Sequence, residues 1–176
     1  MIKDLKNRKK KNRGKDFEGQ FQDDWKRCFG NKKLCFRLKD DVSHKKGTAK
    51  NPCDFICEAN GHVYMVETKS HYENRFPWTS FSQLDLLEDY IDVDNCRPTL
   101  VVWYIDYDVV VWIPVKTVVQ MIDDGYKAFN LRELSEYEQN GYKYLFVPTV
   151  KKKRVFLDSD YYSIINRDDL GDYYDR

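Results

Sequence analysis

The Asn-Gly step at positions 60 and 61 is the feature that most constrains how this chain folds. It separates two segments, 53–58 and 62–70, whose composition is typical of strands. Both central residues of a two-residue hairpin turn take positive φ angles, and Asn followed by Gly tolerates these angles well. The sequence therefore predicts an antiparallel hairpin whose register is fixed by this turn.

Counting outward from the turn pairs Ala59 with His62, and each further step keeps the strands in alignment until Asp54 faces Glu67. Opposed residues have Cβ atoms about 4.5–5.5 Å apart, and two like charges at that distance are destabilising. A divalent cation between the two carboxylates removes this repulsion. Lys69 lies two residues beyond Glu67 and therefore shares its face of the sheet.

Asp54, Glu67 and Lys69 together suit phosphodiester hydrolysis. Carboxylate oxygens hold Mg²⁺, which keeps several of its waters. The ion can lower the pKa of a bound water and neutralise charge on a phosphate, while Lys69 can position the attacking water and stabilise developing charge. The alternative is a surface salt bridge between Glu67 and Lys69 at a strand edge, because an acid-x-Lys pattern on a strand is common.

Hydrophobic periodicity predicts the remaining elements. They are a helix starting near Asp16 with that residue as its N-cap, a strand at 34–38, a helix at 80–92, strands at 99–105 and 109–113, a short helix after Pro114, a helix at 131–139 and a strand at 144–147. This order of helix, three strands, helix, two strands and further helices predicts a mixed α/β domain with helices on a central sheet.

Charge is distributed unevenly along the chain. Eight of the first fifteen residues are basic, whereas six of the last nineteen are Asp. We expect a disordered basic arm at 1–13, a folded domain at 14–157 and an acidic tail at 158–176. The arm suits a polyanion through counterion release, and a merely solvated arm is an equal alternative. The acidic tail is expected to be a solvated end without a function.

Composition excludes several classes of protein. Hydrophobic residues make up 41% of the 176 and aromatic residues 15%, which is more than a disordered chain contains. No apolar run approaches the roughly 20 residues that a membrane span needs, and the charged N-terminus lacks the apolar stretch of a secretory signal. Five cysteines without a CxxC pair predict free thiols. We therefore expect a cytoplasmic protein of one domain with no membrane contact.

Several motifs resemble a known family. Asn51-Pro52-Cys53-Asp54 followed by Glu67-Thr68-Lys69 resembles the PD-(D/E)xK nuclease motif, with one residue inserted between Pro and Asp. Residues 12–18, Asn-Arg-Gly-Lys-Asp-Phe-Glu, resemble an N-terminal segment of RecU-type Holliday junction resolvases, and the hairpin resembles that family's Asp-Tyr, Asn-Gly and Glu-Ala-Lys-Glu-Thr region. Phe81-Ser82-Gln83 resembles its next helix start, and Ile113-Pro114 resembles its Leu-Pro strand end.

The resemblance implies a restriction-endonuclease-like fold for the domain at 14–157. It also implies a homodimeric, Mg²⁺-dependent endonuclease, with Mn²⁺ as a substitute, that nicks opposed strands of four-way DNA junctions. It assigns Asp54 and Glu67 as metal ligands and Lys69 as the catalytic lysine. It also assigns Glu18 as a helix-borne acid that supports the metal, and Gln83 as a neighbour that orients the lysine or a phosphate. By spacing alone, Glu18 and Gln83 are typical surface polar residues.

Basic residues around this site are expected to contact DNA. They are Arg13, which the resemblance places close to the scissile bond, together with Lys15, Lys45, Lys46 and Lys50. The family carries a long stalk between its first and second strands that enters the junction centre, whereas this chain has only the loop 39–51. That short loop predicts a weaker preference for junctions. The basic run 151–154 has no counterpart in the family, and it is either a further DNA contact or a solvated turn.

Two other functions stay open. A restriction-like or repair nuclease of the same fold would act on duplex or flapped DNA, and a recombination accessory protein would bind DNA without cutting it. The intact Asp54, Glu67 and Lys69 argue against the second. Paired nicks on opposed strands require two active sites, most simply in a two-fold dimer. The apolar surfaces available for such an interface are 34–38 and 137–146. The chain is expected to act in a bacterial cell, encoded by the chromosome or by a phage.

Overall fold

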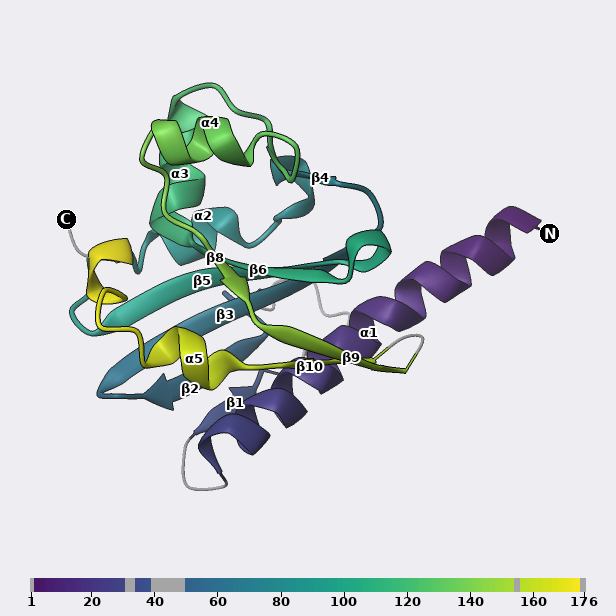
Figure 1. The fold of residues 1–176 in the computed structure, drawn as a ribbon, viewed down its shortest axis with the longest axis horizontal. Helices are drawn as coiled ribbons and strands as arrows, with labels where there is room; N and C mark the ends of the chain where they lie inside the picture. Colours follow the sequence, from purple (N-terminus) through teal and green to yellow (C-terminus); the bar gives the residue numbers. More distant parts are fainter. Residues whose placement is uncertain (1, 31–33, 39–49, 154–155, 175–176) are drawn as a thin grey trace.

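A six-stranded mixed sheet forms the centre of the molecule (Figure 1). The computed structural model describes residues 2–30, 34–38, 50–153 and 156–174. In the order in which they lie side by side, the strands are β1 (Cys35–Arg37), β2 (Phe55–Ala59), β3 (His62–His71), β5 (Cys96–Tyr104), β6 (Val109–Pro114) and β8 (Leu145–Val147). The pair β3–β5 is parallel, and every other neighbouring pair in this sheet is antiparallel. The mixed α/β fold expected from the sequence is therefore confirmed.

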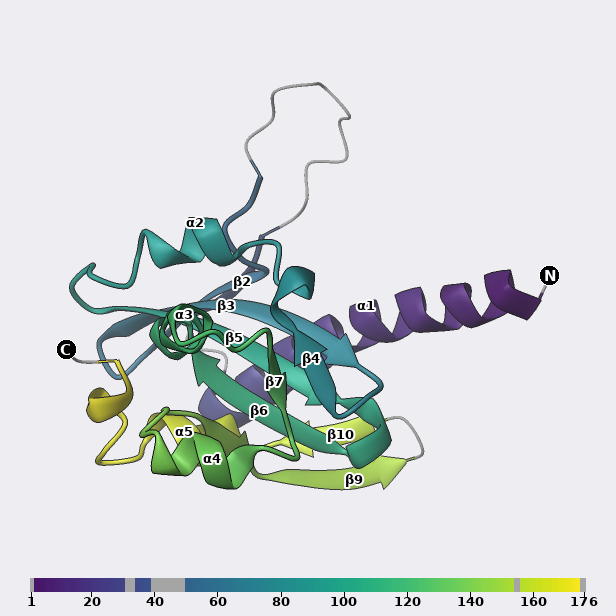
Figure 2. The same cartoon turned by 90° about the horizontal axis from the view of Figure 1, so that it is seen from above.

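Helices cover both faces of this sheet (Figure 2). On one face lie α1 (Ile2–Phe29) and α5 (Tyr161–Ile165), whose aromatic side chains Phe21, Trp25 and Tyr161 belong to one buried core. On the other face lie α2 (Leu84–Glu88), α3 (Val115–Asp123) and α4 (Leu134–Gln139), which contribute Leu87, Val118 and Tyr137 to a second core. The sheet thus separates two apolar layers, as two-sided burial of a central sheet requires.

Short elements complete the fold outside the sheet. Two small antiparallel ribbons are formed by β4 (Arg75–Pro77) with β7 (Ala128–Asn130) and by β9 (Thr149–Lys153) with β10 (Phe156–Ser159). Single turns of 3₁₀ helix are η1 (Trp78–Ser80), η2 (Ile105–Tyr107) and η3 (Gly171–Tyr173). Within the described ranges, no helix has the length and apolar character that crossing a membrane requires.

The β2–β3 hairpin has the register that the sequence predicts. Ala59 pairs with His62, and the ladder continues without a shift to Phe55 and Val66. The turn residues Asn60 and Gly61 have φ angles of 53° and 77°, as a tight hairpin turn demands. The ladder ends one step before Asp54, whose backbone N–H still donates to Val66 O at 3.1 Å. The turn therefore brings Asp54 to the neighbourhood of Glu67.

Two predicted helices differ from the observed ones. Helix α1 starts at Ile2 rather than near Asp16, so residues 2–13 are helical and not a disordered arm. The run is rich in Lys and Arg, which are good helix formers, and no proline interrupts it. In contrast, the helix expected at 80–92 is reduced to α2 (Leu84–Glu88). The following Asp and Asn residues favour turns, the β-branched Ile91 and Val93 are weaker helix formers, and the chain turns from 89 to 95.

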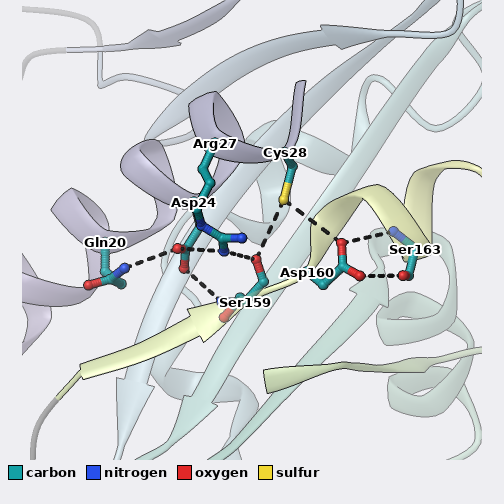
Figure 3. Close-up of polar contacts among 7 residues, drawn as sticks. All are labelled: Gln20, Asp24, Arg27, Cys28, Ser159, Asp160 and Ser163. Atoms are coloured by element: carbon teal, nitrogen blue, oxygen red, sulfur yellow. Dashed lines mark hydrogen bonds and ion pairs between the residues drawn. The ribbon is translucent and has the colours of Figure 1, made fainter. Parts of the chain in front are cut away.

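The acidic segment 158–176 was expected to be a solvated end, and within 158–174 it is instead part of the fold. Ile164, Ile165 and Leu170 are buried in the same core as α1. A buried carboxylate anchors this segment (Figure 3). Asp24 of α1 accepts hydrogen bonds from Ser159 N–H at 3.0 Å, from Arg27 at 3.0 Å and from Gln20 at 3.1 Å.

Arg27 and Asp160 extend this anchor to the start of α5. Arg27 also donates to Ser159 O at 2.9 Å, so both backbone groups of Ser159 are held by α1. The side chain of Asp160 caps α5 by accepting from Ser163 N–H at 3.2 Å. Burial raises the pKa of Asp24, and the hydrogen bonds from Ser159, Arg27 and Gln20 oppose that rise. Polar contacts between chain segments far apart in sequence therefore hold the C-terminal segment on α1.

Replacing Asp24 should destabilise the protein by removing this anchor. Asp24→Ala leaves the buried Ser159 N–H without an acceptor, and an unsatisfied buried donor costs about 1–3 kcal/mol. Urea denaturation should show that loss in the free energy of unfolding. Asp23→Ala, at the exposed neighbouring position on the same helix, should change it by less than about 0.5 kcal/mol. Equal stability of the two variants would show that the anchor is unimportant.

Candidate active site

Two of the predicted catalytic residues, Glu67 and Lys69, point to the face of the sheet that α2 and α3 cover. Glu67 and Lys69 alternate with Thr68 along β3, so both point to the same face as Met65, which belongs to the core shared with those helices. Asp54 lies immediately before β2. Gln83 lies immediately before α2 as its N-cap residue. Four residues from three separate parts of the chain thus meet over the middle of β3.

Glu67 is the most unusual group at this site because it is a fully buried carboxylate, with 0% of its surface exposed. Its Oε1 accepts from Lys69 Nζ in an ion pair. Its Oε2 is buried and has no hydrogen-bond partner within the described parts of the chain. Burial, followed by the nearby negative charge of Asp54, raises the pKa of Glu67 to about 7, although Lys69 opposes the rise. The fold therefore holds a carboxylate where its charged form is disfavoured.

Thr68 holds the second carboxylate in place. Asp54 Oδ2 accepts hydrogen bonds from the backbone N–H of Thr68 at 2.8 Å and from its hydroxyl at 2.8 Å. Thr68 is the residue between Glu67 and Lys69, and it points to the opposite face of β3. The same segment therefore supplies two site residues and fixes the orientation of the third.

Lys69 is positioned from its other side by the start of α2. Its Nζ donates to Gln83 Oε1 at 3.4 Å, and Gln83 Oε1 also accepts from Ser82 Oγ at 2.8 Å. Lys50, one of the predicted DNA contacts, donates to the backbone O of Ser82 at 2.7 Å and is exposed. A cationic side chain thus lies at the edge of the site. Lys45 and Lys46 lie outside the described residues.

Glu18 does not join the carboxylate pair. It forms an ion pair with Arg37 of β1, and 22% of its side chain is exposed. Its charge contributes the smallest of the effects that raise the pKa of Glu67. Across the described ranges, no three His, Cys, Asp or Glu side chains gather closely enough to form a metal site by themselves. The side chains of Arg13 and Lys15 fall outside those that are described.

Sequence reasoning missed three residues that organise the site. Thr68 orients Asp54, Ser82 orients Gln83, and Arg37 pairs with Glu18. The position of Thr68 between Glu67 and Lys69 was visible in the sequence, but its hydroxyl contact depends on how the chain enters β2. The pairing of Arg37 depends on α1 lying across β1, which no local pattern indicates.

The donors at this site fit a hard divalent cation. Glu67 Oε2 is a buried carboxylate oxygen for which the described part of the chain supplies no hydrogen-bond partner, and the charge of Asp54 is close enough to affect Glu67. A cation between the two carboxylates would satisfy that oxygen and remove the repulsion. Mg²⁺ commonly binds through only one or two protein carboxylates and keeps its waters, so two carboxylates suffice.

Comparisons with known proteins find distant structural likenesses among the solved structures. No protein-family model and no curated protein matches this sequence. Among solved structures, one similar structure is Hjc, a Holliday junction resolvase from the archaeal hyperthermophile Archaeoglobus fulgidus. The TM-score is 0.38 and the sequence identity 15%, over 53% of this chain and 69% of that chain. At this TM-score the likeness carries no residue role or activity over to this chain.

The buried Glu67 predicts a pH-dependent stability in metal-free protein. Its pKa of about 7 in the folded state exceeds its ordinary value of 4.5, so the folded state binds the proton more tightly. Stability from this group is therefore present at low pH and is lost as the pH rises from about 4.5 through 7. Relative to Glu67→Gln, the wild type should lose about 1–3 kcal/mol of unfolding free energy between pH 5 and pH 8.

Urea denaturation in EDTA at the two pH values measures this difference. Glu73→Gln, at an exposed site shortly after β3, serves as the control for removal of a carboxylate. The unfolding free energy of Glu73→Gln should change with pH as that of the wild type does. If the gap between the wild type and Glu67→Gln were the same at pH 5 and pH 8, the unfavourable burial of the Glu67 charge would be refuted.

Proposed function

We propose that this protein is a divalent-metal-dependent endonuclease that cuts DNA, with Asp54 and Glu67 as the metal ligands. The observation that carries the proposal is the buried Oε2 of Glu67, which has no partner among the described residues and lies beside a second carboxylate and Lys69. A buried charge without full compensation costs stability. Perturbed carboxylates of this kind cluster at functional sites, which favours a catalytic role over a surface salt bridge.

The chain's own residues divide the work of hydrolysis. Thr68 fixes Asp54, and the parallel pairing of β3 with β5 fixes the backbone of Glu67. Lys69, held between Glu67 and Gln83, orients the attacking water and stabilises the charge that develops on the scissile phosphate. Bound Mg²⁺, or Mn²⁺ in its place, would supply a water of lowered pKa and neutralise phosphate charge.

Branched DNA is the substrate that we propose, and a four-way junction in particular. Support comes from the resemblance of the motifs at Arg13, Asp54, Glu67 and Gln83 to RecU-type Holliday junction resolvases. Lys50 at the edge of the site adds positive charge for a phosphate backbone. The short loop 39–51 favours a restriction-like or repair nuclease acting on duplex or flapped DNA as the second candidate, because the family's junction-entering stalk is missing from the sequence.

A homodimer is part of the same proposal, because two opposed nicks need two sites. Strand β1 is at an edge of the central sheet, the position at which a sheet can add a further strand. Two large apolar side chains at this edge are exposed, Leu34 by 52% and Phe36 by 58%. A second copy of the chain across this edge would cover them. Two-fold dimers are the commonest closed assemblies.

The function is tested by incubating the protein with labelled four-way junction, flap and linear duplex DNA, with and without Mg²⁺. We expect Mg²⁺-dependent cleavage that is fastest on the junction. Lys69→Ala should lower the cleavage rate by about 10² or more while DNA binding changes little, because the residue acts on the reacting phosphate. Light scattering on the free protein and its junction complex gives the number of copies.

Lys127→Ala is the matched control, because Lys127 is exposed and lies outside the site. It should cleave at the rate of the wild type. Cleavage by Lys69→Ala at the wild-type rate, or no cleavage of any DNA with Mg²⁺ or Mn²⁺, would overturn the proposal. If the protein is a monomer and cuts duplex DNA as fast as junction DNA, the restriction-like or repair nuclease would be the better assignment.

A further inference from the structure

A polar cavity lies away from the candidate active site, at the other end of β3 and β5. Its volume is about 630 Å³, and its lining includes His62, Asn95, Arg97, Lys116 and Tyr174. Arg97 pairs across the sheet with Tyr64, three residues before the pairing of Glu67 with Leu100. Strand residues an odd number of positions apart point to opposite faces. The Arg97 side chain therefore lies on the face of the sheet opposite the candidate active site.

Arg97 is a buried cation in this cavity, with 9% of its surface exposed. Its Nη1 donates to the Tyr64 hydroxyl at 2.8 Å. The guanidinium lies 5.1 Å from the ring centre of Tyr174 and 5.7 Å from that of Tyr64. Over the parts of the chain that the structure describes, the ion pairs do not include Arg97. Buried charges in proteins are ordinarily paired, and among the described residues this guanidinium has no carboxylate partner.

The two tyrosines orient the guanidinium without neutralising it. The Tyr174 hydroxyl is 2.7 Å from Thr99 Oγ1 and accepts from Trp112 Nε1 at 2.7 Å, which fixes the ring beside Arg97. Burial raises the pKa of both Tyr64 and Tyr174, so both stay uncharged. The result is a preorganised cation whose planar fork of donors suits the paired oxygens of a phosphate or carboxylate.

The rest of the lining favours a phosphate ester over a small bare anion. Lys116 adds a second cation from the first turn of α3, which packs on the other face of the sheet, so the cavity is lined from both faces at the end of the strands. The N-terminus of α3 also carries the positive end of the helix dipole. The lining also includes exposed Asp94 and Asn95, which can bond hydroxyls or amines of the ester away from its phosphate. The volume is in the range of small-molecule sites, and it is larger than a single ion needs.

We propose that this cavity binds a phosphate ester of nucleotide size, whose phosphoryl oxygens pair with Arg97 and Lys116. The phosphate comes either from a free mononucleotide or from a strand of bound DNA. In both cases the recognised group is the same. The proposal goes beyond the proposed nuclease activity and does not depend on it, because its residues lie away from Asp54, Glu67 and Lys69.

Calorimetric titration in EDTA tests the site without metal at the carboxylates. The probes are dAMP, AMP and adenosine, which lacks the phosphate. We expect saturable binding of at least one of the two mononucleotides and none of adenosine. Arg97→Gln should weaken that binding at least about tenfold, since hydrogen-bonded charge pairs are the strong ones. Lys116→Gln should weaken it severalfold, and the exposed control Lys127→Gln should leave it unchanged.

A second titration, with a short DNA duplex in EDTA, distinguishes the two sources of the phosphate. The DNA backbone is the source if the mononucleotides give no heat but Lys116→Gln and Arg97→Gln both weaken duplex binding. Each lost phosphate contact should then reduce the slope of log K against log salt by about 0.9. Lys116→Gln keeps the test valid if Arg97→Gln fails to fold. The proposal would be overturned if the probes bind but neither Arg97→Gln nor Lys116→Gln weakens their binding. It would also be overturned if no probe binds at all. In either case Arg97 would be only a packing residue.

Discussion

The pairing of β2 with β3 is the interaction on which the rest of the structure depends. The turn at Asn60 and Gly61 fixes the register, and because strand side chains alternate between faces, a slip of one residue would move Glu67 and Lys69 to the opposite side. The parallel pairing of β3 with β5 then buries the middle of β3 between two helical layers. Every contact at the candidate site follows from that placement.

Burial in the centre of the sheet perturbs the carboxylate of Glu67 and also makes its charge unfavourable for stability. Glu67 is buried next to the charge of Asp54, with one oxygen paired to Lys69 and the other without a hydrogen-bond partner from any described residue. A fold selected for stability alone would place an apolar residue there, since buried ion pairs contribute little net stability. The surrounding contacts instead hold the group in place, with Thr68 on Asp54 and Gln83 on Lys69. Such preorganisation is what a catalytic metal site requires.

The opposite face of the sheet shows a related arrangement with the sign of the charge reversed. There a buried Arg97 is oriented by Tyr64 and Tyr174, and both tyrosines are uncharged. The Tyr174 contact exists because the C-terminal segment folds back over the sheet, held at its start by Asp24. The C-terminal segment therefore contributes directly to the polar cavity around Arg97. One of its acidic residues, Asp160, caps α5.

Part of the fold and of the candidate site could be predicted from the sequence, because it depends on local chemistry. The hairpin register and the mixed sheet follow from a turn type and from apolar periodicity, both of which act over a few residues. The predicted start of α1 was wrong because the basic run 2–13 was interpreted as disordered, although Lys and Arg favour helices. The packing of the C-terminal segment was missed because the Asp24–Ser159 contact joins residues 135 positions apart. Likewise, no local pattern pairs Arg37 with Glu18.

The central claim is that Asp54 and Glu67 share one divalent cation, and calorimetric titration with Mn²⁺ tests it most directly. The account predicts saturable binding of one ion per chain by the wild type, and loss of that binding in Asp54→Asn. Glu58→Gln, which removes a carboxylate from the same hairpin near its turn, should bind as the wild type does. Equal binding by Asp54→Asn and the wild type, or no saturable binding by the wild type, would contradict the account.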